Sequence, residues 1–264
     1  MSDSLLVSPE WVADRQDDSA VHLVDVREPW EYDSIGHIPG AINIPFDSYR
    51  DAESPAPGTL PGTDAFGDLL GEAGIGPDDT IVAYDDTHGV FAARLVLTAL
   101  AYGHTDIAVL DGDFSAWRQG YQTSDEPPAT EPTAYEIDGL VDDAPIVDRA
   151  AVEAAIESGE TTLIDTRDQD EYDEYHLPGA VRVDWMELVD EETRGVKAAG
   201  AIEALLADRG ISTDRETPII LYCNTSRRLS HTFVALRSLG FTDVAVYEGS
   251  MADWLADDAV DIDR

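Results

Sequence analysis

The sequence is poor in basic residues. Its 264 residues include 55 Asp and Glu but only 16 Lys and Arg, which gives a formal net charge of −39, and Lys197 is the single lysine. A surface with this charge repels nucleic acids and anionic membranes, so we expect neither as a partner. In molar salt the Debye length is about 3 Å, and the self-repulsion of such a surface largely vanishes. The composition therefore predicts a cytoplasmic protein of a salt-accumulating halophile, with an ordinary acidic cytoplasmic protein as the alternative.

Cysteine and long apolar runs are scarce as well. Cys223 is the single cysteine, which excludes an intramolecular disulfide and any CxxC metal or redox site. The N-terminal residues MSDSLLVSPEW have no basic region and no long apolar core, so we expect no signal peptide. No apolar run approaches the length of about 18 residues that a membrane span needs. The sequence has no His-Glu-x-x-His motif and no Gly-x4-Gly-Lys motif, and we expect no metal and no cofactor.

The chain contains one long internal repeat. Three features of the first half return in the same order in the second half: an Asp-x-Arg segment at 25–27 and 165–167, a His-[Ile/Leu]-Pro-Gly-Ala segment at 37–41 and 176–180, and an apolar run ending at Asp85 and Cys223. So many matches in one order indicate a duplicated domain. We expect domains at residues 1–124 and 134–264. The residues between them, 125–133, are rich in proline and typical of a linker.

Each half of the repeat has the pattern of an α/β domain. Short β-branched runs alternate with helical patterns, as in the run at 80–84 followed by the helical pattern at 91–101. This alternation predicts a mainly parallel sheet flanked by helices. In such sheets ligands bind outside the carboxyl ends of the strands, which is where both Asp85 and Cys223 fall.

The stretch 221–240 is the strongest candidate for a functional site. The apolar run before Cys223 predicts a buried strand, and the spacing of Leu229, Phe233 and Leu236 predicts a helix that ends at the glycine closing the stretch. A thiol between a strand and a helix N-terminus faces backbone N–H groups and the positive end of the helix dipole. It should therefore ionise more readily than an ordinary cysteine and act as a nucleophile. A buried structural cysteine is the alternative.

Taken together, these motifs resemble the two-domain rhodanese family of thiosulfate and 3-mercaptopyruvate sulfurtransferases. The resemblance covers nearly the whole chain, including a closing Gly-Ser…Trp segment at 249–254. It implies two tandem rhodanese-like domains and a cycle in which a thiolate takes sulfane sulfur from a small anion and holds it as a persulfide. The acceptor would be cyanide, a thiol or a sulfur-relay protein. By position Cys223 would carry the persulfide, and domain one would be silent because Asp85 cannot carry sulfane sulfur.

The resemblance also implies roles for the loop after the cysteine. Its backbone N–H groups would cradle the outer sulfur of the persulfide, from residues Asn224, Thr225, Ser226, Arg227 and Arg228. Three arginines are candidate ligands of the donor, since arginine holds a carboxylate or sulfonate through paired hydrogen bonds: Arg227, Arg228 and, at the mouth of the pocket, Arg167. The loop has neither basic residues directly after the cysteine nor the Gly-Ser-Gly-Val-Thr segment of mercaptopyruvate enzymes. We expect thiosulfate as the donor, with 3-mercaptopyruvate as the alternative.

Two other classes of function are alternatives to sulfur transfer. The same fold houses thiolate phosphatases and arsenate reductases, but their loop is one residue longer than the segment from Cys223 to Arg228. The shorter loop suits a single sulfur atom and crowds a tetrahedral oxyanion. The second alternative is a non-catalytic rhodanese module for binding or regulation, against which the cysteine and its cationic loop argue. We expect His231, one turn into the following helix, to be a packed polar residue rather than a base.

Overall fold

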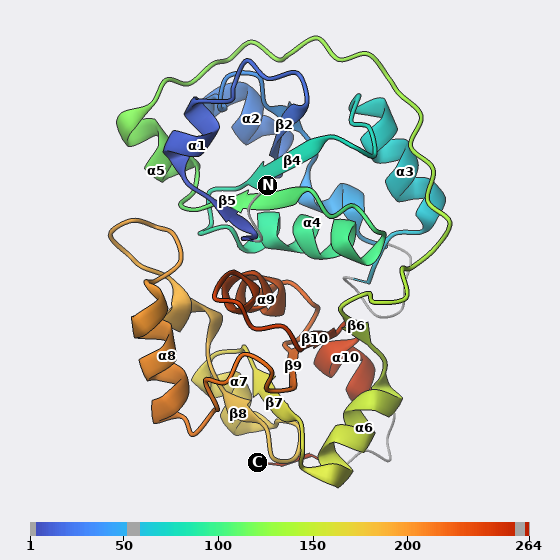
Figure 1. Cartoon of the computed structure of the whole chain (residues 1–264), viewed down its shortest axis with the longest axis vertical. Helices are drawn as coiled ribbons and strands as arrows, with labels where there is room; N and C mark the ends of the chain where they lie inside the picture. The colour runs from blue at the N-terminus through green and yellow to red at the C-terminus, as the bar shows by residue number, and fades with distance from the viewer. Residues whose placement is uncertain (1–3, 52–58, 257–261, 264) are drawn as a thin grey trace.

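The computed structural model describes residues 4–51, 59–256 and 262–263, which form two α/β domains. Figure 1 shows them lying against each other, with the chain running once through each. Each domain has a five-stranded sheet in which every described strand pair is parallel. The expected fold, two parallel sheets flanked by helices, is confirmed.

The two sheets have the same strand order. Domain one has the order β1-β5-β4-β2-β3, with strands β1 (Leu6–Val7), β2 (Val21–Asp25), β3 (Ile42–Asn43), β4 (Thr80–Tyr84) and β5 (Ile107–Leu110). Domain two has the order β6-β10-β9-β7-β8, with strands β6 (Ile146–Val147), β7 (Thr162–Asp165), β8 (Val181–Arg182), β9 (Ile219–Tyr222) and β10 (Val244–Tyr247). The central strands β4 and β9 are almost continuously apolar because helices cover both of their faces.

The helices also correspond between the domains. Those of domain one are α1 (Pro9–Ala13), α2 (Pro29–Ile35), the 3-10 helix η1 (Phe46–Tyr49), α3 (Thr63–Glu72), α4 (Val90–Ala101) and α5 (Phe114–Gly120). Those of domain two are α6 (Arg149–Ser158), α7 (Gln169–Glu174), the 3-10 helix η2 (Trp185–Leu188), α8 (Ala199–Asp208), α9 (Arg228–Ser238) and α10 (Ser250–Trp254). Among the described residues, no helix has the length and apolar character that crossing a membrane requires.

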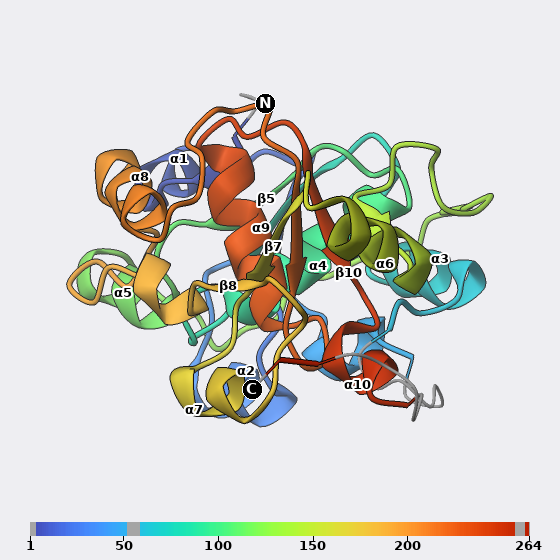
Figure 2. The ribbon, with the colours of Figure 1, turned by 90° about the horizontal axis from the view of Figure 1, so that it is seen from below.

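The domains meet through α4 and α9, which Figures 1 and 2 place against each other between the two sheets. Ten of the twelve residues of α4 are buried, including Leu95 and Val96. A helix that is apolar all round must be covered on all sides. Here α9 packs against α4, with Val234 near Ala93. These side chains belong to one apolar cluster that extends through both domains. The interface is therefore part of the core rather than a hinge.

Buried ion pairs reinforce this interface. Arg194, in the segment 189–196 of domain two, donates from Nε to both carboxylate oxygens of Asp113 at 2.7 and 2.8 Å, and the Asp113 side chain is fully buried. Arg94 of α4 donates from Nη2 to Glu248 Oε1 at 2.8 Å, next to the loop that follows β10. Removing one partner of such a pair leaves a charge in a place that water reaches poorly. The two pairs therefore hold the domains in one arrangement.

The segment after α5 follows the surface of domain one before it enters domain two, as the long green trace in Figure 1 shows. The Thr133 N–H donates to the Gly71 carbonyl at 2.9 Å, and the Tyr135 hydroxyl lies 2.7 Å from His104 Nδ1. The Val141 N–H donates to the carbonyl of the last residue of α4 at 3.1 Å. These contacts attach residues up to 141 to domain one, beyond the position 134 at which we expected domain two to begin.

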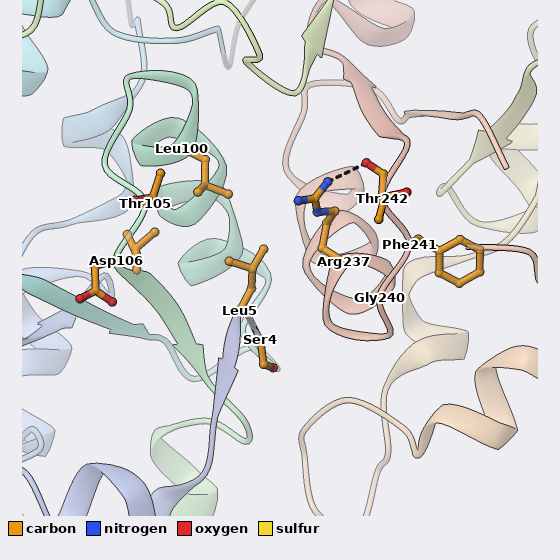
Figure 3. A pocket seen from close by; sticks show the side chains of 10 residues that line it. Ser4, Leu5, Leu100, Thr105, Asp106, Arg237, Gly240, Phe241 and Thr242 are labelled. Atoms are coloured by element: carbon orange, nitrogen blue, oxygen red, sulfur yellow. Dashed lines mark hydrogen bonds between the residues drawn. The ribbon is translucent and has the colours of Figure 1, made fainter. Parts of the chain in front are cut away.

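A cleft of about 850 Å³ opens between the domains (Figure 3). Leu5 and Leu100 line it on the side of domain one, and Arg237 and Phe241 on the side of domain two. Leu100 and Arg237 lie near the C-terminal ends of α4 and α9, whereas the loops with Asp85 and Cys223 lead into the N-terminal ends of these helices. The cleft is thus at the opposite end of the interface from the candidate chemistry.

Candidate active site

Cys223 follows the last residue of β9 and is 1% exposed. The loop behind it turns sharply at Ser226, whose φ of 61° is left-handed. A non-glycine residue in this region costs roughly 1 kcal/mol or more and persists only where its surroundings enforce it. Here the Ser226 hydroxyl donates to the Glu248 carbonyl, and the Ser226 carbonyl accepts from Ser230 Oγ at 2.7 Å. The loop is therefore held in one shape by the segment after β10 and by the first turn of α9.

Ser250 is the side chain that meets the cysteine most directly. The Cys223 N–H donates to Ser250 Oγ at 3.2 Å, and this oxygen lies 4.0 Å from Cys223 Sγ. The same hydroxyl is 3.0 Å from the Tyr247 carbonyl, so its single proton has two possible acceptors. Ser250 is fully buried and left-handed, with a φ of 50°. From the sequence, Ser250 was visible only as part of the closing Gly-Ser…Trp segment, with no role at the site.

The matching loop of domain one holds a carboxylate in place of the thiol. Asp85 Oδ1 accepts from the N–H groups of Thr87 at 2.6 Å and Gly89 at 2.8 Å, and Oδ2 accepts from those of Phe91 at 2.7 Å and Ala92 at 3.0 Å. His88 in this loop has a φ of 57°, the counterpart of the left-handed Ser226. Burial raises the pKa of Asp85, and the four N–H donors oppose that rise. The loop thus converges N–H groups on a pair of terminal oxygens.

A carboxylate oxygen stands one covalent bond farther from Cβ than a cysteine Sγ does. It therefore occupies the place of the outer sulfur of a persulfide, in the order Cβ–Sγ–S⁻. In domain two, within the described residues, Ser250 Oγ is the one hydrogen-bonding group recorded at Cys223 Sγ, and no backbone N–H reaches it. The expectation that the reduced thiol faces backbone N–H groups is therefore not met in the described residues, and the ring of N–H donors is seen around the carboxylate of domain one. By position, the four donors in domain one match Thr225, Arg227, Leu229 and Ser230, of which the first two are among the residues predicted to cradle a persulfide.

Arg228, the first residue of α9, is paired with a carboxylate. Its Nη1 and Nη2 donate to Glu171 Oε2 at 2.5 Å and Oε1 at 2.9 Å, and Asn224 Nδ2 donates to the same carboxylate. The hydrogen bonds from Arg228 lower the pKa of Glu171 to about 2. Glu171, on α7, was not among the residues expected at the site. It fixes both Arg228 and the first side chain of the active loop.

Arg167 is enclosed rather than placed at the mouth of a pocket. Its side chain has no exposed surface, and its guanidinium donates to Asp165 Oδ2 at 2.7 Å and to the Tyr175 carbonyl at 2.6 Å. Its Nη1 lies 3.3 Å from Asn224 Oδ1. Arg167 therefore contacts the loop through Asn224, and its expected place at the mouth of a pocket does not agree with its full burial.

Arg227 differs from both of these arginines. Its side chain is exposed, and no carboxylate of the described chain lies within ion-pair distance of it. Its guanidinium carbon lies 5.1 Å from the centre of the Phe91 ring, which belongs to domain one. Of the three arginines predicted from the sequence, Arg227 is the one whose hydrogen-bond donors remain available to a ligand.

His231 lies one turn into α9 and is 2% exposed. Neither of its ring nitrogens has a hydrogen-bond partner in the part of the chain that the structure describes, and its ring meets Trp185 edge-on at 5.3 Å. Burial, and then the nearby His88, lower the pKa of His231 to about 4. It is a packed neutral ring, as expected. No cluster of three or more metal-ligating side chains occurs in residues 4–51, 59–256 and 262–263.

Known proteins match this chain over nearly its whole length. It is 30% identical to a thiosulfate sulfurtransferase of Pseudomonas aeruginosa, over 95% of this chain and 93% of that protein. It is 29% identical to the sulfur carrier protein TtuD of Thermus thermophilus, over 95% and 93%. SseA from Escherichia coli, solved as a 3-mercaptopyruvate sulfotransferase with a rhodanese fold, is 27% identical and superposes with a TM-score of 0.82, over 94% of this chain and 98% of SseA. The rhodanese-like domain family matches residues 8–120 and again residues 148–257. The chain therefore belongs to the rhodanese-like family, as two tandem copies of its domain.

Proposed function

We propose that this protein is a sulfurtransferase in which Cys223 takes sulfane sulfur from thiosulfate and passes it to a thiophilic acceptor. The observation that carries the proposal is the ring of four N–H groups around Asp85 in the loop that matches the active one. That ring stabilises negative charge one bond beyond the position of a thiol sulfur. A persulfide on Cys223 places its negative charge at the same point, so the loop that follows Cys223 is suited to hold this charge.

In the first half-reaction the Cys223 thiolate attacks the outer sulfur of thiosulfate. A new S–S bond forms on the enzyme, the S–S bond of thiosulfate breaks, and sulfite leaves with the electron pair. The terminal sulfur of the persulfide keeps one negative charge. In the second half-reaction an acceptor such as cyanide attacks that sulfur, forms thiocyanate and returns the thiolate. Neither step needs a proton donor, which agrees with the neutral, packed state of His231.

The identity of the sulfur donor is a further part of this proposal. Thiosulfate is favoured because the exposed Arg227 offers guanidinium donors that no carboxylate of the described chain occupies. Several relatives at about this identity are named thiosulfate sulfurtransferases, which supports the same donor. A second candidate is 3-mercaptopyruvate, which SseA and its similarity to this chain favour. The similarity to a sulfur carrier protein supports a further protein thiol as the natural acceptor.

Intact mass spectrometry tests the proposal. The purified chain is incubated with thiosulfate or with 3-mercaptopyruvate, desalted and weighed. We expect one added sulfur atom on the wild type, lost again with release of thiocyanate when cyanide is added. Cys223→Ser should gain no sulfur while keeping the circular dichroism spectrum of the wild type. Sulfur uptake by this variant, or no uptake by the wild type from either donor, would contradict the proposal.

A further inference from the structure

Two phenylalanines of domain one lie between two arginines, one from each side of the active site. The rings of Phe46 and Phe91 meet edge-to-face, with centroids 4.7 Å apart. The guanidinium of Arg50 lies 4.3 Å from the centre of the Phe46 ring, and that of Arg227 lies 5.1 Å from the centre of the Phe91 ring. An arginine on an aromatic face is held in position while its N–H groups stay free to bind. The silent domain thus supports a residue of the active loop.

The charges of these two arginines are poorly neutralised. Arg227 has no ion-pair partner among the described residues, while its neighbour Arg228 is engaged by Glu171. Arg50 pairs with Asp47, whose side chain is 71% exposed, and such a surface pair contributes little. The Nε of Arg50 is buried and has no hydrogen-bond partner in the described structure.

Four acidic residues, Glu28, Glu31, Asp85 and Asp86, line the same small cavity as Phe46 and Phe91. The Asp85 carboxylate is enclosed by its four N–H donors. Partial burial, and then repulsion by Arg228 and Arg50, lower the pKa of Arg227, while the Cys223 sulfur opposes this effect. Arg50 and Arg227 therefore repel each other, and the Cys223 sulfur acts on Arg227, in a protein whose net charge is −39. Two neighbouring guanidinium groups on so acidic a chain are suited to attract an anion.

We propose that Arg50 and Arg227 form an anion subsite, shared between the two domains, that binds the sulfonate end of a dianionic sulfane donor such as thiosulfate. The proposal rests on the sulfurtransferase function above and extends it to a residue of the silent domain. A sulfonate has three oxygens, so it can accept hydrogen bonds from two guanidinium groups at once. Its sulfane sulfur then points to Cys223. A monoanionic donor with a single carboxylate gains less from the second cation.

Steady-state kinetics of four variants test the subsite. They are Arg50→Gln, Arg50→Lys, Arg227→Gln and the control Arg118→Gln, which removes the same charge from an exposed side chain on α5. We expect Arg50→Gln and Arg227→Gln each to raise the KM for thiosulfate about tenfold with little change in kcat, the loss of roughly one charge-assisted hydrogen bond. For 3-mercaptopyruvate the rise should be under about threefold, because that donor carries one charge. Arg50→Lys should recover part of the loss, and Arg118→Gln should stay within about twofold of the wild type.

The outcomes separate this inference from the proposed function. If Arg50→Gln and Arg118→Gln have the same KM for thiosulfate, or if Arg50→Gln affects both donors equally, the shared subsite is wrong. The sulfurtransferase assignment would stand in that case, provided that Cys223 still gains one sulfur by mass. If the wild type gains no sulfur from any donor, the assignment itself fails. Melting temperatures of all four variants check that a change in KM does not reflect unfolding.

Discussion

The ion pair between Arg194 and Asp113 offers the sharpest test of how the two domains are held together. Arg194→Ala removes a guanidinium that donates to both oxygens of a fully buried carboxylate, across the domain interface. Breaking a fully buried pair from one side costs about 3–5 kcal/mol. Two features reduce this value. The Arg194 side chain is 30% exposed, and Asp113 keeps the N–H groups of Ala116 and His88 at 3.1 and 3.2 Å. We therefore expect a loss of about 2 kcal/mol.

The backbone of Arg194 supplies an internal control. Its φ of 62° is left-handed, a conformation that costs an L-residue roughly 1 kcal/mol and that glycine adopts freely. Arg194→Gly loses the same ion pair but relieves this strain, so it should be about 1 kcal/mol more stable than Arg194→Ala. Arg118→Ala, on the helix that Asp113 caps, should change the free energy of unfolding by no more than about 0.5 kcal/mol.

Thermal unfolding at one fixed, high salt concentration measures these differences. For a chain of this size about 1 kcal/mol corresponds to roughly 2–4 °C in Tm. The expected shift for Arg194→Ala is therefore about 4–8 °C. The loss of the interdomain pair should also broaden the transition or split it in two, because the domains become less coupled. A melting curve for Arg194→Ala that coincides with that of Arg118→Ala would refute this account of the interface.

Three further predictions concern the two loops. Glu171→Gln should lower the free energy of unfolding by about 1 kcal/mol at neutral pH, after allowance for solvent screening. Because Arg228 lowers the pKa of Glu171 to about 2, this stabilisation is complete above the ordinary pKa of 4.5 and is lost as the pH falls towards 2. The difference in Tm between wild type and variant should therefore narrow below pH 4.5 and not above it. Ser250→Ala leaves the buried Cys223 N–H without its acceptor, so we expect the free energy of unfolding, measured with denaturant, to fall by about 1–3 kcal/mol. Persulfide formation should also be slower. An unchanged denaturation midpoint would count against this role of Ser250. Asp85→Asn turns an NH₂ group towards N–H donors, so it should lower the Tm of the protein. Sulfur transfer per folded molecule should be retained. A loss of turnover with an unchanged Tm would mean that domain one is not silent.

Local patterns in the sequence predicted the elements that carry the site. The apolar runs predicted β4 at the bounds observed and β9 as the strand that ends just before Cys223, and the spacing of Leu229, Phe233 and Leu236 predicted α9. These patterns are visible because the burial of a strand or of a helix face imposes a short period on the chain. The repeat was visible because each copy must satisfy the same packing. The periodicity is read from a few neighbouring residues, and the repeat from a comparison of the sequence with itself.

The residues that contact the Cys223 loop could not be predicted from such local patterns. Glu171 meets Arg228 across 57 positions of the sequence, and Ser250 meets Cys223 across 27. The sequence of the loop does not predict which arginine forms an ion pair with a carboxylate. All three arginines, Arg167, Arg227 and Arg228, were therefore candidate ligands of the donor from the sequence, whereas the structure encloses the first, pairs the third and leaves the second on Phe91.

The sequence by itself determined that this protein has two parallel α/β domains, one with a thiol and one with a carboxylate at the same turn. It did so because hydrophobic periodicity and duplication are properties of the chain alone. Only the tertiary structure decided which charges near Cys223 are free, because ion pairs form between side chains that folding brings together from distant positions. It also decided that domain one borders the loop of Cys223, since the packing of α4 on α9 sets that contact.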